Sequence, residues 1–144
     1  MDQIGAARAR LDQASDVPGI LDAAYEAFED MLPVIRDQED PAGGAFVAFV
    51  LSGAFAANGR DAVAAAPSLP RVTTGQTASA DDDPPGGASA LEAATALAGL
   101  SGLLVCRLTD AAFWAADAAD KAACAEGARQ ASRIWSLLGG MAGQ

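Results

Sequence analysis

Residues 41–57 read PAGGAFVAFVLSGAFAA and contain no charged side chain. The large apolar residues of this stretch leave no polar stripe at the 3.6-residue helical period, as their positions show: Phe46, Val47, Phe49, Val50, Leu51 and Phe55. A helix that is apolar on every side is typically buried. Asp40 suits the N-cap, Pro41 the first turn and Gly59 the position after the last turn. The stretch therefore predicts a central helix against which other helices pack.

Two other interpretations of this stretch are less consistent with its flanks and length. The uncharged run over 41–59 is long enough to span a bilayer, but no aromatic belt or basic cluster borders it. A strand of this length rich in alanine is unusual. We therefore expect a buried helix and no membrane span.

Small residues repeat every four positions along the same stretch, at Gly44, Ala48, Ser52 and Ala56. Such a ridge allows a second helix to approach closely. The ridge predicts either tight packing inside one chain or an interface between two copies.

A second apolar helix is predicted over 89–108. Ser89 and Glu92 have the spacing of a capping box, and no charge occurs over 93–106. Amphipathic patterns predict three further helices over about 2–14, 17–36 and 120–138. The second has an apolar stripe from Ile20 to Ile35, with a kink or break expected from Pro33. The buried side of the third is expected to include Trp135. We predict an all-α bundle of about five helices, in which the two apolar helices, 41–57 and 89–108, are central.

Between the two apolar helices, residues 71–88 are rich in Thr, Ser, Asp, Pro and Gly and offer almost nothing to bury. This composition is typical of a flexible linker. We interpret residues 1–144 as a single helical domain whose halves, 1–70 and 89–144, are joined by this linker.

The net charge of −10, from 19 acidic and 9 basic residues, argues against nucleic acid and anionic membranes as partners. It is compatible with a basic protein partner. Cys106 and Cys124 lie in apolar helical contexts and are expected to be buried thiols. The first residues show no basic or apolar region of a signal peptide, so we expect a cytoplasmic protein.

The sequence contains no histidine and no glycine-rich phosphate loop. The absence of histidine excludes Ser-His and Cys-His catalytic sites. The absence of a glycine-rich phosphate loop excludes the common nucleotide-binding motifs. We assign no catalytic residue and no cofactor. The leading hypothesis is a non-catalytic helical protein that acts by association, either as a homodimer or with a basic protein. The homodimer would use Gly44, Ala48 and Ser52, or the Trp135 end of the last helix.

Paired helix carboxylates support an alternative hypothesis. Glu26, Glu29 and Asp30 share one side of a predicted helix, and Asp117 and Asp120 form a second pair. The pattern resembles the all-α NTP pyrophosphohydrolases, although Asp117 stands where that family has Glu. The resemblance implies a Mg²⁺-dependent phosphohydrolase in which these five carboxylates bind the metal. It requires the two acidic sets to meet in the fold.

Overall fold

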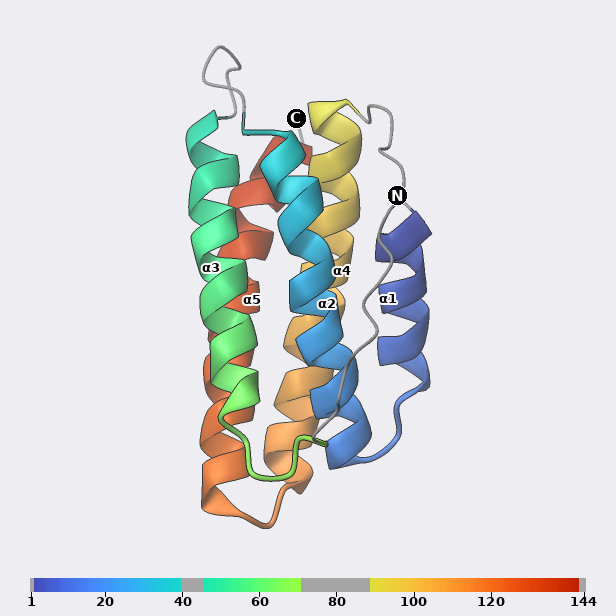
Figure 1. Cartoon of the computed structure of the whole chain (residues 1–144), viewed down its shortest axis with the longest axis vertical. Coiled ribbons are helices and arrows are strands. Elements are labelled where there is room, and N and C mark those ends of the chain that lie inside the picture. The colour runs from blue at the N-terminus through green and yellow to red at the C-terminus, as the bar shows by residue number, and fades with distance from the viewer. Residues whose placement is uncertain (1, 40–45, 71–88, 143–144) are drawn as a thin grey trace.

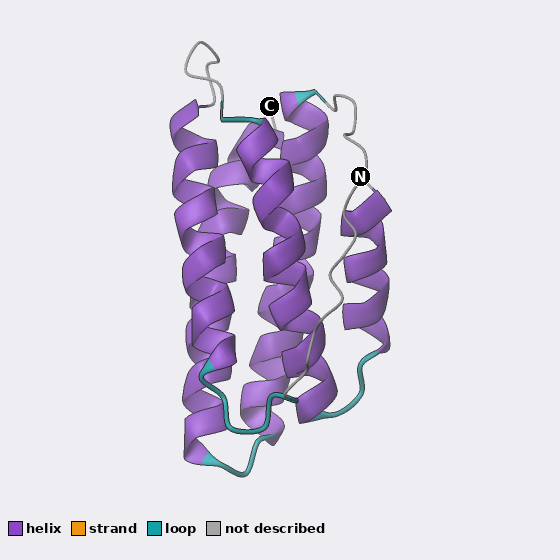
Figure 2. Cartoon of the chain, viewed as in Figure 1, coloured by secondary structure: helices purple, strands orange, loops and turns teal. Residues whose placement is uncertain are grey.

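The computed structural model describes residues 2–39, 46–70 and 89–142, and every regular element within these ranges is an α-helix (Figure 2). The helices are, in chain order, α1 (Asp2–Gln13), α2 (Val17–Asp37), α3 (Phe46–Ala64), α4 (Ala90–Trp114) and α5 (Ala118–Ala142). The predicted all-α helical bundle is confirmed. The predicted linker, 71–88, lies outside the described residues.

Four of the helices form an antiparallel bundle (Figure 1). Helices α3 and α4 lie at opposite corners, and each packs against both α2 and α5. Helix α1 lies outside the four, along α2 and α4. Helices α3 and α4 run in the same direction, and α2 and α5 run in the opposite direction (Figure 1).

Local capping signals fix where two of the helices begin. The Asp16 side chain accepts a hydrogen bond from the Gly19 backbone N–H at 2.9 Å, directly before α2. The Ser89 hydroxyl accepts from the Glu92 backbone N–H, and the Glu92 carboxylate accepts from the Ser89 N–H, each at 3.0 Å. The predicted capping box of α4 is therefore present, and it satisfies N–H groups that have no partner within the helix.

The side of α2 that faces the bundle is apolar at helical spacing. Five of its residues are almost completely buried: Ile20, Ala24, Ala27, Met31 and Ile35. Pro33 lies on the exposed side, and α2 continues through it to Asp37. The predicted stripe is confirmed, and no break occurs at the proline.

Of the two helices predicted to be central, α4 is the more enclosed. It packs against α1, α2 and α5, and Leu97, Leu100 and Leu104 are fully buried along it. Helix α3 forms over 46–64, but it is not buried on every side. Its neighbours α2 and α5 cover one side, and Val47 and Leu51 on the other side are exposed. The prediction that this apolar stretch is buried all round is corrected accordingly, and residues 41–45 lie outside the described part.

Gly59 does not end α3, which continues to Ala64. A Cβ atom at position 59 would lie only 2.5 Å from Cε1 and Cζ of Phe28. The glycine therefore allows the buried Phe28 ring to pack directly on the α3 backbone. The prediction of a helix end at Gly59 was wrong because this glycine provides space for a side chain of another helix.

The small-residue ridge lies inside the bundle over its described part. Ser52 and Ala56 are fully buried, and Ala48 is partly buried against the core. Gly44 lies outside the described residues. The ridge is therefore used for packing within the chain, and Ser52 is not accessible to a second copy.

Candidate interaction surface

Two of the predicted metal-binding carboxylates on α2 are paired with an arginine of α1. Arg10 Nε lies 3.2 Å from Glu26 Oε1, and Arg10 Nη2 lies 3.0 Å from Asp30 Oδ2. Burial raises the pKa of Asp30, and the charge of Arg10 and its hydrogen bond partly offset that effect. The arginine thus neutralises part of the acidic cluster and joins α1 to α2.

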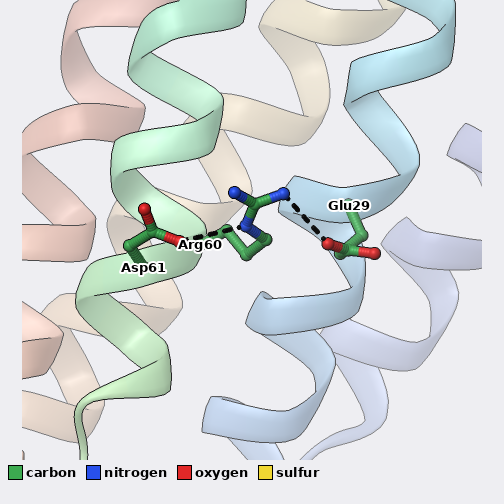
Figure 3. A network of polar contacts seen from close by, with 3 residues as sticks. All are labelled: Glu29, Arg60 and Asp61. Atoms are coloured by element: carbon green, nitrogen blue, oxygen red, sulfur yellow. Dashed lines mark hydrogen bonds and ion pairs between the residues drawn. The ribbon is translucent and has the colours of Figure 1, made fainter. Parts of the chain in front are cut away.

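The third carboxylate of this cluster, Glu29, is paired with α3. Arg60 Nη1 lies 3.2 Å from Glu29 Oε2, and Arg60 Nε lies 3.2 Å from Asp61 Oδ1 (Figure 3). The Arg60 side chain therefore lies between two acidic groups on neighbouring helices. The Arg60–Glu29 pair joins α3 to α2, but an ion pair near the surface contributes little stability by itself.

Asp117 and Asp120 lie where α5 begins and have structural partners. Asp117 Oδ1 accepts hydrogen bonds from the backbone N–H groups of Ala119 at 2.7 Å and Asp120 at 3.3 Å. Buried Asp120 accepts from the Ser68 N–H at 3.0 Å and from the Ser68 hydroxyl at 2.6 Å. One aspartate caps α5, and the other attaches the segment after α3 to α5.

The structure does not bring the two acidic sets into one cluster. Over residues 2–39, 46–70 and 89–142, no group of three or more His, Cys, Asp or Glu side chains is placed to hold a metal ion. The arginines that pair with Glu29 and Asp30 lie 31 and 20 residues away in the chain, respectively. Sequence spacing along α2 alone gives no sign of them.

Sequence reasoning also missed the role of Arg107. Its Nε donates to the Leu11 carbonyl at 3.3 Å, and its Nη2 donates to the Ala14 carbonyl. These carbonyls lie at the end of α1, so the helix itself has no backbone N–H group that could donate to them. Arg107 Nη1 also lies 3.7 Å from Asp110 Oδ2 on the same helix. Arg107 thus caps α1 from α4.

Large apolar side chains are exposed on two separate parts of the bundle. On α3, the outer side carries Val47, Val50 and Leu51, and a shallow groove of about 320 Å³ borders Val50 between α2 and α3. On α4 and α5, the exposed side chains are Leu91, Phe113, Trp114 and Trp135. Of these, Phe113 is 83% exposed and Trp135 54% exposed.

The Trp135 ring lies between α4 and α5 against two glycines. A Cβ atom at Gly102 of α4 would lie 3.7 Å from both Cδ1 and Nε1 of the ring. A Cβ atom at Gly139 of α5 would lie 3.7 and 3.8 Å from Nε1 and Cδ1. The indole therefore packs on backbone on one side, while about half of the residue remains open to solvent. The prediction that Trp135 belongs to the buried side of α5 is corrected.

The two parts of the chain differ strongly in charge. Residues 1–70 contain 11 acidic and 4 basic side chains, whereas residues 89–144 contain 5 acidic and 4 basic ones. Helices α4 and α5 are thus nearly neutral in an otherwise acidic protein. The two cysteines also differ: Cys124 is buried as predicted, but Cys106 is exposed on α4.

Comparison of the chain with protein-family models, curated proteins and solved structures finds no match. One helix within the described ranges, α4, has the length and apolar composition needed to cross a bilayer. In the bundle, 44% of its most apolar window is buried. The central helix of a helical bundle satisfies the same criteria.

Proposed function

We propose that the protein acts by association, as a homodimer held together by apolar side chains on the outside of its helices. The observation that carries this proposal is the exposure of Val47, Leu91, Phe113 and Trp135 on a bundle that already has a complete core. Exposed apolar patches mark interaction sites in soluble proteins. Three of these side chains lie on α4 and α5, and Val47 lies on the separate apolar part of α3. Aromatic side chains are enriched at such interfaces.

The chemistry of the polar residues supports association over catalysis. Each of the five carboxylates of the phosphohydrolase hypothesis has a structural partner: Arg10 for Glu26 and Asp30, Arg60 for Glu29, Ser68 for Asp120, and the first turn of α5 for Asp117. A metal ion bound by these carboxylates would compete with these partners.

Sedimentation equilibrium over a hundredfold range of protein concentration tests the proposal. The chain mass is 14.4 kDa. We expect an average mass that rises with concentration toward twice this value. A constant mass of one chain up to millimolar concentration would refute the homodimer.

A second form of association is favoured by the excess of acidic residues over 1–70. We propose that this acidic part binds a basic protein, with an affinity that falls as salt screens the charges. Titration with a lysine-rich peptide at low and high salt tests this, with the same peptide carrying Gln for Lys as control. Equal binding of the two peptides would refute an electrostatic contact.

A further inference from the structure

The outward side of α4 is a long uncharged stripe. Residues 91, 95, 102, 106, 109 and 113 recur at spacings of three, four and seven, so they share one side of the helix. They are Leu91, Thr95, Gly102, Cys106, Thr109 and Phe113, and all are exposed or partly exposed.

A matching stripe on α5 lies beside it. Residues 125, 128, 132, 135 and 139 share one side of α5 and carry no charge. They are Ala125, Ala128, Ser132, Trp135 and Gly139, and none is buried. The packing of the Trp135 ring against Gly102 shows that the two stripes adjoin. We call the two stripes together the α4–α5 face.

We propose that the α4–α5 face is the interface of the homodimer and that its partner is the same face of a second copy. This inference rests on the proposed function and specifies its site. Self-association of a chain with a charge of −10 is opposed by repulsion. Repulsion is smallest when the nearly neutral helices meet and the acidic residues of 1–70 point away from the contact.

The size of the face is close to the lower end of the range for a specific dimer. The stripes run over residues 91–113 and 125–139, which corresponds to lengths of about 34 and 22 Å. With each stripe about 10 Å wide, the face covers roughly 560 Å². A standard interface buries roughly 600–1,000 Å² on each partner.

The charges at the ends of the face favour one orientation. Lys121, the only lysine of the chain, lies in the first turn of α5, and Glu92 lies in the first turn of α4. These two helix starts lie at opposite ends of the bundle (Figure 1). A two-fold axis perpendicular to the helices brings Lys121 of one copy toward Glu92 of the other. A parallel arrangement would instead place the two lysines together.

Matched charge insertions test the location of the interface. Cys106→Glu places a carboxylate in the middle of the α4–α5 face. Leu51→Glu makes the same change at an exposed position of α3 and serves as the control. Because the contact would bury a new carboxylate of each copy without a partner, we expect Cys106→Glu to weaken the dimer on the order of a hundredfold. We expect Leu51→Glu to leave the dimer intact, and both variants to keep the thermal unfolding of a folded bundle.

Cross-linking of the wild-type protein gives an independent measurement that needs no substitution. A two-fold axis that crosses α4 at its middle residue, Gly102, places each Cys106 about 6 Å from the axis along the helix and the two thiols about 12 Å apart. A bismaleimide of that length should therefore join them. We expect a covalent dimer at concentrations where the mass is doubled, and none after dilution.

The possible outcomes distinguish two questions: whether a dimer forms, and whether its interface is the α4–α5 face. If Leu51→Glu dissociates the dimer and Cys106→Glu does not, the interface is on α3 and only the present inference fails. If both variants remain dimeric, or both dissociate, the α4–α5 face is not the specific interface. A wild-type protein that stays monomeric at high concentration overturns both the inference and the proposed homodimer.

Discussion

Replacement of Gly59 by alanine tests the packing of α2 against α3. The Cβ atom of the new side chain would be built 2.5 Å from Cε1 and Cζ of Phe28, well inside any real carbon–carbon contact. Phe28 is fully buried and surrounded by the core, so its ring has no free space to enter. Either the ring or the α3 backbone has to move.

Two opposing effects determine the size of the change. Alanine is favoured over glycine within a helix by about 1 kcal/mol. Overpacking of a well-packed core costs about 1–3 kcal/mol. We expect a net loss of up to about 2 kcal/mol in the free energy of unfolding, measured by urea denaturation followed by circular dichroism.

Gly53→Ala in the same helix is the matched control. There the nearest atoms to a new Cβ are Ile35 Cγ2 and Glu39 Oε2, both at 3.4 Å, which is an ordinary contact. The helix preference then dominates, and stability should rise by up to about 1 kcal/mol. If Gly59→Ala stabilises the protein as much as Gly53→Ala does, the Phe28 ring does not pack directly on the α3 backbone at position 59.

Three further predictions concern the core, the thiols and the buried aspartate. Phe49→Ala removes a fully buried ring and should cost about 3–5 kcal/mol in denaturant unfolding, whereas a loss below about 1 kcal/mol would contradict its burial. Burial, with a smaller contribution from the charge of Asp120, raises the pKa of Cys124 to about 11. At pH 8, therefore, Ellman's reagent should modify only Cys106 in the dilute native protein and both thiols in urea; two fast thiols in the native state would contradict this. Asp120→Ala leaves two Ser68 donors without their acceptor and should cost about 1–3 kcal/mol. Asp120→Asn keeps one acceptor oxygen and should cost less, and equal losses would argue against these hydrogen bonds.

The sequence predicts the helices well where their ends are determined locally. Asp16 and the pair Ser89 and Glu92 mark the starts of α2 and α4 because the capping atoms lie within three residues of the groups they bind. The apolar stripe of α2 is likewise a property of one short segment. These features require no knowledge of how the helices pack.

Features that depend on neighbouring helices were not predictable in the same way. Val47 and Cys106 are exposed because they lie on the sides of α3 and α4 that no other helix covers. An apolar segment without a polar stripe does not show which of its sides will be uncovered. The role of Gly59 depends on Phe28 of another helix. For the same reason, the local sequence does not reveal the partners of the α2 carboxylates, because Arg10 and Arg60 reach them from α1 and α3.

The environment of Trp135 tests the proposed dimer most directly. The variant Trp114→Phe leaves Trp135 as the only tryptophan, about half of which is exposed in the single chain. We predict that its fluorescence emission shifts to longer wavelength on dilution, with the same midpoint as the fall in sedimentation mass from two chains to one. A fall in mass without any change in Trp135 emission would contradict an interface on the α4–α5 face.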